Sequence, residues 1–561
     1  MKYRYTQFAT IGASALALVM LAACAAQETK KEAPAAAPAA APAAPAKAAP
    51  AYTQGPAAMT EAEFTDAKRI YFDRCAGCHG TLRKGATGPA LTAEKMGKVG
   101  TKGLESIIHN GTPGGMPSWG KDGIMNAAET SLMARYIQHE PPAPPERTLK
   151  EVKESWKVIV PPDKRPKKPE HGADVQDMFG VVLRDAGQVA IFDGKTKELM
   201  SIANTGYAVH ILRASASGRY FYSIGRDGKV SMIDLYMKKP DVVAEAKPCA
   251  DGRSVDVSKY KGYEDKYAIV GCYWPPQMTI HDGNTLEPLK SIGTRGNTIE
   301  GVYHPEPRVA SIVANHYKPQ WVVAVKETGQ VWLVDYSDLK STNITMIDTA
   351  PFLHDGGFDA TGRYFQVAAN MANKMVIVDT KEGKLAKIIE TASKPHPGRG
   401  ANWVDPKHGP VTGTTHLGAA TYTIWGSDPA KHADKAWKVL YEVETKGGGS
   451  LFTKTHPKSD KVWYDHTLNP NLEVQKTICY FKKADPKGGS TCLQLSNRAT
   501  HFEYNKAGDE MWVSVWNKKG AESELVIIDD KTGKVKQQIK DARLVTPTGK
   551  WNVHNTVADL Y

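Results

Sequence analysis

The stretch that decides the fold is GQVAIFDGKTKELMSI, residues 187–202. An alternating apolar strand runs into an acid–glycine turn and a second strand follows, which is the pattern of an antiparallel hairpin. Seven further copies of this unit start at Gly228, Gln277, Gly329, Asn373, Ala420, Lys476 and Ser523. Consecutive starts are 41 to 56 residues apart, which is the period of a β-propeller blade. We therefore expect an all-β, eight-bladed propeller over residues 151–561.

A small all-α domain is expected ahead of the propeller, over residues 55–140. Its first segment, MTEAEFTDAKRIYFDRC, carries Thr60 and Glu63 at the spacing of a helix capping box. Apolar residues then recur on one helical face, and AAETSLMARYIQHE closes the domain with a second helical pattern. The prolines of residues 141–150 interrupt this pattern, so we expect a hinge there.

The segment CAGCH carries the sharpest chemical motif of the chain. Cys-x-x-Cys-His is the attachment motif of a c-type haem, in which both thiols, here Cys75 and Cys78, bond to the haem vinyl groups. His79 is then one axial iron ligand, and Met116 in the loop GTPGGMPSWG is the expected second one. His109 is the alternative ligand, but it lies in a helical pattern. The alternatives are a thioredoxin-like cysteine pair and half a zinc site, but neither explains the histidine that follows the second cysteine.

The first residues have the composition of a targeting segment. Residues 1–24 combine a basic start, an apolar stretch and small residues, as secretory signals do. LAAC at its end resembles a bacterial lipobox with Cys24 as the lipidated residue, and ordinary cleavage nearby is the alternative. The Ala/Pro-rich residues 25–54 are expected to form an extended tether. We therefore expect a periplasmic protein, with lipidated Cys24 as its membrane anchor.

The remaining composition is that of a soluble globular protein, with 41% hydrophobic and 24% charged residues. The formal charge of +12 is not gathered into dense basic runs, so we expect a solvated basic surface and no nucleic-acid partner. Cys249, Cys272, Cys479 and Cys492 lie scattered in a chain whose export permits disulfides. A bridge between Cys479 and Cys492 across a hairpin stays open, but the sequence favours buried free thiols.

Three histidines share a position in the propeller repeat. His210, His354 and His396 each stand 18 to 24 residues before the next copy of the unit. The chain enters a blade there, near the central channel. His396 lies in PHPGRG, where prolines and glycines restrict the direction of its ring. Repeat position alone leaves their convergence open, because connections elsewhere also carry histidines, such as His304 and His416.

Arginines accompany these connections. They are Arg184, Arg213, Arg226 and Arg253. Convergent guanidinium groups suit a ligand that bears carboxylates. Each arginine alone is more often a surface or blade-packing residue.

Many separate segments resemble those of the dihaem nitrite reductases of the cytochrome cd1 type. They include RCAGCHGTLRKGATGPAL, RDAGQVAIFDG, TGYAVHI, YWPPQMTI, FLHDGG, PHPGRGAN and TPTGKWNVHNT. The resemblance implies a covalent haem c in the first domain and a non-covalent haem d1 in the propeller channel. It implies His354 and His396 as the distal catalytic pair, which donates protons as imidazolium. The other residues that it implies are Cys75, Cys78, His79 and Met116 for haem c, and His210 (the iron ligand), Arg184, Arg226 and Arg253 for haem d1.

The activity that the resemblance implies is one-electron reduction of nitrite to nitric oxide and water in denitrification. Its further implications are a homodimer, a small c-type cytochrome or cupredoxin as electron donor, and oxygen reduction as a side activity. One alternative is the dihydro-haem d1 dehydrogenase of haem d1 biosynthesis, whose pattern lacks the full pair of distal histidines. Another is a haem d1-binding protein without turnover, which usually lacks the haem c domain. The tether departs from the family, Tyr52 has no clear match to its N-terminal tyrosine, and His281 and His501 have no assigned role.

Overall fold

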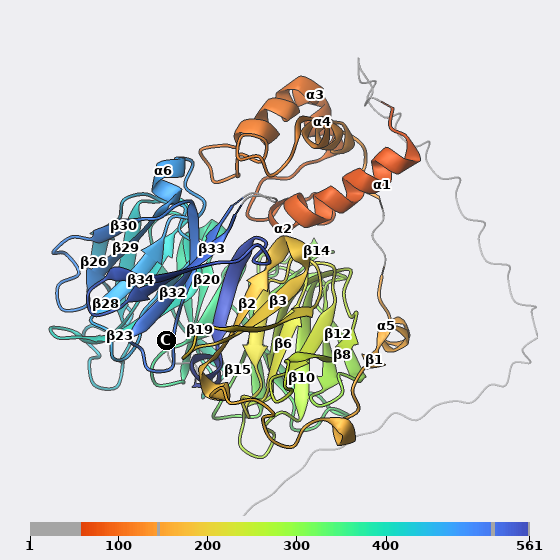
Figure 1. The fold of residues 1–561 in the computed structure, drawn as a ribbon. Helices are drawn as coiled ribbons and strands as arrows, with labels where there is room; N and C mark the ends of the chain where they lie inside the picture. The colour runs from red at the N-terminus through yellow and green to blue at the C-terminus, as the bar shows by residue number, and fades with distance from the viewer. Residues whose placement is uncertain (1–57, 143–145, 518–521, 559–561) are drawn as a thin grey trace, which may run out of the picture. The chain divides into compact units, whose positions relative to one another are not determined.

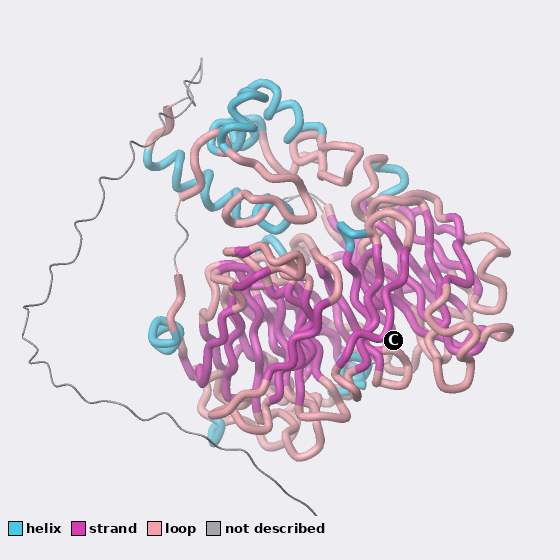
Figure 2. The backbone as a smooth tube through the Cα atoms, turned by 180° about the vertical axis from the view of Figure 1, so that it is seen from behind, coloured by secondary structure: helices cyan, strands magenta, loops and turns pink. Residues whose placement is uncertain are grey.

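The structure is a computed structural model that describes residues 58–142, 146–517 and 522–558. Three predictions fall outside these ranges, namely the signal segment 1–24, lipidation at Cys24 and the tether 25–54, and Tyr52 lies outside them as well. The chain from Gln54 onward forms one compact unit. Helix and strand are segregated within it, as Figures 1 and 2 show. In the described parts of the chain, no helix has both the length and the hydropathy that crossing a bilayer requires.

The N-terminal part of the described chain is helical. Its elements are α1 (Glu61–Ile70), a π-helical turn (Tyr71–Cys75), α2 (Ala76–His79), α3 (Ala93–Asn110) and α4 (Ala127–Tyr136). The predicted capping box is present, because the Thr60 hydroxyl accepts from the Glu63 N–H and the Glu63 carboxylate accepts from the Thr60 N–H. The buried faces meet in one core that contains Ala67, Ile70 and Leu104. The predicted small helical domain is therefore confirmed.

The rest of the described chain forms eight antiparallel sheets and one small hairpin. The first sheet joins β35 (Pro547–Asn552) to β2 (Met178–Leu183), β3 (Gln188–Asp193) and β4 (Leu199–Asn204). The second contains β5 (Ile211–Ala214), β6 (Tyr220–Ile224), β7 (Val230–Asp234), β8 (Asp241–Ala246) and β1 (Lys157–Val158). The third contains β9 (Asp251–Val257), β10 (Tyr267–Trp274), β11 (Gln277–Asp282) and β12 (Pro288–Gly293). The fourth contains β15 (Val309–Ala314), β16 (Gln320–Val325), β17 (Gln330–Asp335) and β18 (Ile344–Asp348).

The other four sheets repeat this order. The fifth contains β19 (Leu353–Phe358), β20 (Tyr364–Ala369), β21 (Lys374–Asp379) and β22 (Lys384–Glu390), and the sixth β23 (Pro395–Asp405), β24 (Gly409–His416), β25 (Thr421–Gly426) and β26 (Val439–Glu444). The seventh contains β27 (Thr453–Lys454), β28 (Lys461–Asp465), β29 (Thr477–Lys482) and β30 (Thr491–Gln494), and the eighth β31 (Arg498–Tyr504), β32 (Glu510–Trp516), β33 (Glu524–Asp529) and β34 (Lys534–Lys540). The small hairpin pairs β13 (Gly296–Asn297) with β14 (Tyr303–His304). The helices of this part are α5 (Leu149–Ser155), α6 (Leu472–Gln475) and α7 (Val553–Ala558), and its 3₁₀ turns are Pro162–Lys164, Val175–Asp177, Arg184–Ala186 and Asn370–Ala372.

One strand from each sheet lines a closed ring. These strands contact one another in the order β5, β9, β15, β19, β23, β27, β31, β35 and back to β5. The strand that completes the ring, β35, comes from the C-terminal end and pairs with β2 from the start of the propeller. A closed ring leaves no open sheet edge at the join. The predicted eight-bladed propeller is confirmed.

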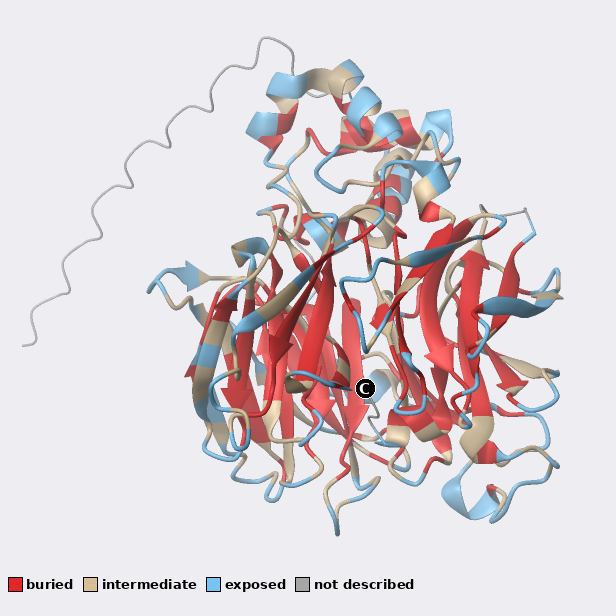
Figure 3. Cartoon of the chain, turned by 90° about the vertical axis from the view of Figure 1, so that its left-hand side faces the viewer, coloured by how far each residue is buried: buried red, intermediate tan, exposed pale blue. Residues whose placement is uncertain are grey.

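The repeat that reveals the fold corresponds to the third strand of each blade. The eight copies begin within two residues of the starts of β3, β7, β11, β17, β21, β25, β29 and β33. Blades pack face to face, so these strands are buried on both sides, as the patterns of β7 and β33 illustrate, and Figure 3 shows buried strands of the propeller in red. Burial on both sides selects the apolar runs that make the period visible in the sequence.

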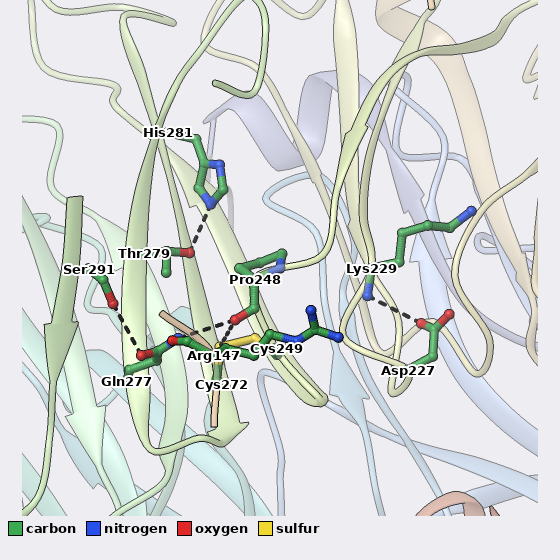
Figure 4. The surroundings of a disulfide bond; sticks show 10 residues. All are labelled: Arg147, Asp227, Lys229, Pro248, Cys249, Cys272, Gln277, Thr279, His281 and Ser291. Atoms are coloured by element: carbon green, nitrogen blue, oxygen red, sulfur yellow. Dashed lines mark hydrogen bonds between the residues drawn. A yellow bond between two sulfur atoms is a disulfide. The ribbon is translucent and has the colours of Figure 1, made fainter. Parts of the chain in front are cut away.

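The prediction of four buried free thiols is wrong. Cys249 is joined to Cys272 and Cys479 to Cys492. Cys479 and Cys492 are direct partners in the register of β29 and β30, which brings their side chains together. Cys249 ends the connection before β9, and Cys272 lies in the neighbouring strand β10 (Figure 4).

His281, which had no assigned role, is a structural residue of the third blade. Its Nδ1–H donates to the Leu286 carbonyl at 2.9 Å, and its Nε2 accepts from the Thr279 hydroxyl at 2.8 Å (Figure 4). Burial lowers the pKa of His281 to about 4. The ring is therefore a neutral, fully hydrogen-bonded part of the core.

Candidate functional site

The CAGCH segment presents its groups as a c-type haem requires. Cys75 and Cys78 are free thiols. The His79 ring is buried, and its Nδ1–H donates to the Pro89 carbonyl at 2.8 Å, which leaves Nε2 available to a metal. Gly88 packs closely against this ring. A Cβ at that position would stand 2.7 Å from His79 Cε1, so the ring leaves no room for a side chain there. These residues fit a covalently attached haem with His79 as an axial ligand.

Met116 and His109, the two candidates for the second haem c ligand, lie in different environments. Met116 is in the loop between α3 and α4, where its carbonyl accepts from the Thr112 N–H at 3.1 Å, and its half-buried side chain packs on the helical core. His109 is on α3, as its sequence pattern indicates, and its ring packs against Gly120. The loop position of Met116 favours it as the ligand, which remains a prediction.

The propeller brings His354 and His396 together. They come from β19 and β23, which are neighbours in the ring of first strands. Their ring centroids are 4.7 Å apart at an interplanar angle of 57°. His210 immediately precedes β5 and is exposed. Because β5 stands three places from β19 and four from β23 in a ring of eight, His210 lies on the other side of the channel from the pair.

Asp355 is a member of this cluster that repeat position did not indicate. One carboxylate oxygen lies 3.4 Å from His354 Nδ1, and the other accepts from Arg253 at 3.0 Å. His396 Nδ1–H donates to the Leu451 carbonyl at 2.9 Å, so Nε2 is its free nitrogen. Ligating atoms of His354, Asp355 and His396 all lie within 4.8 Å of one another.

Burial makes both imidazoles of the pair hard to protonate. It lowers the pKa of His354 to about 3 and that of His396 to about 4. The Asp355 carboxylate opposes this effect on both rings, and Lys326 adds to it. Burial therefore favours the neutral imidazoles, and the imidazolium donors that the resemblance implies stay a prediction. An anion placed against the pair would favour protonation, so binding of an anion and of protons should be linked.

The three arginines expected in the propeller pocket occupy two places. Arg253 is in β9 and faces the histidine pair through Asp355. Arg184 donates to the Asp73 carbonyl at 3.2 Å, so it contacts the helical domain. Arg226 pairs with Asp251 at 2.6 Å and lies beside Gly77 of the CAGCH segment.

Tyr273 connects these two places, and sequence reasoning missed it. Its hydroxyl accepts from Arg253 Nε at 3.0 Å. Arg226, Arg253 and Arg308 lie over its ring, at 5.2, 5.8 and 4.8 Å from the centroid. Burial alone would raise the pKa of Tyr273, but the surrounding cations lower it overall. Arg308 also donates to the Gly77 carbonyl at 3.3 Å, so one chain of contacts runs from the haem attachment segment to the histidine pair.

Two guanidinium nitrogens on ring strands lack an acceptor. Arg213 Nε on β5 and Arg253 Nη1 on β9 are buried and donate to no group within the described chain. A buried guanidinium nitrogen without a partner is costly, and a carboxylate ligand would satisfy it. The channel therefore fits a ligand that carries carboxylates, such as haem d1, with His210 available to its iron.

Comparisons with known proteins agree with this architecture. The family "Cytochrome D1 heme domain" matches residues 173–556, and "Cytochrome C oxidase, cbb3-type, subunit III" matches residues 62–137. A nitrite reductase from Stutzerimonas stutzeri is 51% identical over 90% of this chain and 95% of its own length.

A second class of relative is more distant. The dihydro-heme d1 dehydrogenase of Pseudomonas aeruginosa is 25% identical over 89% of this chain and 96% of its own length. A solved structure of a dihydro-heme d1 dehydrogenase in complex with DHE superimposes with a TM-score of 0.66 at 24% identity, covering 88% of this chain and 99% of that one. At that identity the likeness concerns the fold.

Proposed function

The chain belongs to the cytochrome cd1-type nitrite reductase family, and from that premise we propose how its residues share the reduction of nitrite. The enzyme carries one haem c and one haem d1 and reduces nitrite. The reaction consumes one nitrite, one electron and two protons, and it yields nitric oxide and water. When bound, the haems supply the electron and the iron that holds nitrite. The protons must come through the protein.

The cofactor contacts that we propose divide between the haem attachment segment of the helical domain and the propeller channel. Cys75 and Cys78 would attach haem c, and His79 and Met116 would ligate its iron. His210, across the ring of strands from the histidine pair, would ligate the haem d1 iron. Arg253 supports the carboxylates of haem d1, and Arg184 and Arg226 do so from the junction with the helical domain. Free Nε2 on His79 and the unpartnered guanidinium nitrogen of Arg253 support this division.

His354 and His396 are the proposed proton donors. Their rings lie 4.7 Å apart, so both reach one small anion. Nitrite brings a negative charge against two neutral imidazoles, which raises their proton affinity and draws in the protons that the reaction needs. The protons pass to one nitrite oxygen, the N–O bond to it breaks, and the oxygen leaves as water. Until then the imidazolium charges stabilise the bound anion.

The observation that carries this proposal is the juxtaposition of His354 and His396. A dehydrogenase of haem d1 synthesis would need no pair of donors, and its curated representative is 25% identical against 51% for the nitrite reductase. The test supplies anaerobic holoprotein with ¹⁵N-nitrite and a reduced one-electron donor, and follows ¹⁵NO by mass spectrometry. We expect sustained release of ¹⁵NO. Conversion of dihydro-haem d1 without any ¹⁵NO would contradict the proposal.

The finer features belong to the same proposal. The basic and apolar start of the sequence supports periplasmic export, and LAAC supports lipidation at Cys24. A small c-type cytochrome or cupredoxin is the proposed donor, the protein is proposed to act as a homodimer, and oxygen reduction is a proposed side activity. Mass spectrometry of the mature N-terminus tests lipidation, because a Cys24→Ser variant would then lose the acyl mass. Sedimentation of the holoprotein tests the homodimer, and oxygen uptake by the reduced holoprotein tests the side activity.

A further inference from the structure

Asp355 occupies a position at which the strand pattern predicts no channel contact. Adjacent residues of a regular strand point to opposite faces of the sheet. The pairing of β19 with β20 shifts register between Leu353 and Gly356, so the strand is irregular at these residues. His354 and Asp355 are consecutive there, and both join the same cluster. The irregularity thus brings a carboxylate to the imidazole pair.

The carboxylate is held from two sides. Arg253 donates to one oxygen at 3.0 Å, and the Arg253 Nε–H in turn donates to the Tyr273 hydroxyl at 3.0 Å. The other oxygen faces His354 Nδ1 at 3.4 Å. The Tyr273 hydroxyl therefore holds Arg253, Arg253 in turn fixes the carboxylate, and the second carboxylate oxygen remains for the imidazole.

The charged and titratable groups around Asp355 come from several strands. The charges of Arg253, His354 and His396 act directly on the Asp355 carboxylate, and that of Lys326 acts on both imidazoles. Arg399, on the neighbouring strand β23, lies beside Gly357 of β19. Apart from Asp355 these groups are cationic or become cationic. They hold the pKa of Asp355 well below its usual range, although burial raises it. The carboxylate thus stays ionised and offsets part of the positive charge around the pair.

We propose that Asp355 is a positioning residue of the nitrite site, which orients His354 through Nδ1 and makes a proton available on its opposite nitrogen, with Arg253 and Tyr273 holding the carboxylate. This inference rests on the proposed role of His354 as a donor. Asp355 itself neither gains nor loses a proton. His354 binds a proton as nitrite arrives, gives it to the nitrite oxygen that leaves as water, and is then reprotonated from solvent.

A purely structural role for Asp355, as the counter-ion of Arg253, makes a different prediction. Asp355→Asn keeps an oxygen that accepts from Arg253 but removes the charge that favours protonation of His354. If His354 must be protonated, activity falls as pH rises. Without the carboxylate charge His354 loses its proton more readily, so the activity of the variant falls at a lower pH than that of the wild type. A charge at this distance shifts a neighbouring titration by about one unit or more, so we expect the basic limb to move about one pH unit downward. A structural loss would lower the rate by one factor at every pH.

The experiment compares holoproteins in two measurements. The first is the pH profile of nitric oxide release. The second is the number of protons taken up when nitrite binds to the oxidised holoprotein near neutral pH, followed with a pH-indicator dye, and it needs no turnover. We expect Asp355→Asn to shift the profile and to take up fewer protons. Asp355→Glu keeps the charge, so it should stay close to the wild type in both.

Asp379→Asn is the matched control. Asp379 is in the same blade and also pairs with an arginine, Arg363, but it is not part of the histidine cluster. It should leave both measurements unchanged. An Asp355→Asn profile that is lowered without moving, with unchanged proton uptake, would overturn the proposal. If Asp355→Asn does not fold, Asp355→Glu decides, because a basic limb that moves downward although the charge is retained contradicts the electrostatic role. Absence of any nitric oxide from the wild type would instead refute the proposed function, while proton uptake would still test Asp355.

Discussion

Arg308→Met should destabilise the protein by more than the loss of one arginine's contacts. Arg308 and Glu327 are a buried pair, with side chains 1% and 2% exposed. Arg308 Nε donates to the Glu327 carboxylate at 2.8 Å, and the backbone N–H of Arg308 donates to its other oxygen at 2.7 Å. Removing the guanidinium leaves a buried carboxylate without its cation, which costs about 3–5 kcal/mol of unfolding free energy. It also removes the hydrogen bond to Gly77 in the haem attachment segment.

A double variant separates the two contributions. Arg308→Met combined with Glu327→Gln removes both charges, so it should recover most of the loss and end within about 2 kcal/mol of the wild type. Urea unfolding of the full chain, followed by tryptophan fluorescence, measures the unfolding free energies of the wild type, Arg308→Met, Glu327→Gln and the double variant as a double-mutant cycle. A single variant that loses less than about 1 kcal/mol, or a double variant whose loss is the sum of the two singles, would refute the reasoning, because either result means that Glu327 is not stranded.

Three further predictions follow from the described contacts. Replacing Cys249 and Cys272 by Ser should lower the unfolding free energy by about 3 kcal/mol, because a bridge over 23 residues restricts the unfolded chain; an unchanged urea midpoint would contradict this. Gly88→Ala should reduce haem c incorporation in a pyridine haemochrome assay, because its Cβ would stand 2.7 Å from His79 Cε1, and full incorporation would count against this placement. Burial lowers the pKa of His281 to about 4 in the folded protein, against an ordinary value of about 6.5 in the unfolded chain, so the unfolding free energy falls by up to about 1.4 kcal/mol for each pH unit below 6.5. We expect the melting temperature of the wild type to fall from pH 7 to pH 5, and that of His281→Gln to fall less steeply over the same range.

The propeller was predictable because its signal is repeated. Third strands such as QVAIFD at Gln188–Asp193 are buried on both faces, so their apolar runs recur with the period of the blade. Closure of the ring was not predictable in this way. The strand β35 begins with a proline and carries Gly549 and Lys550, so its sequence lacks the apolar alternation of the other strands. Its place is decided by pairing with β2, far away in the chain.

The candidate site was predictable only in part. Repeat position singled out His354 and His396 but left their convergence open, and the family resemblance implied the pair, whereas the CAGCH motif is local. Asp355 was missed because regular alternation would place it on the opposite face from His354, and the register shift in β19 cancels that rule. The disulfides were missed for a related reason. A pair such as Cys479 and Cys492 follows from the register of two strands, which spacing alone does not determine.

The most direct test of the central claim is single-turnover nitric oxide formation by wild type, His354→Ala, His396→Ala and the double variant. Each protein is fully loaded with both haems, reduced and mixed with nitrite without oxygen, and His432→Ala serves as the control because His432 pairs with Asp428 outside the cluster. If the two imidazoles act on one anion, each single variant loses at least about a hundredfold in rate, as removal of a proton donor does. The double variant should then lose little more than either single variant, and the control should match the wild type. Nitric oxide formation at the wild-type rate in both single variants would contradict the claim.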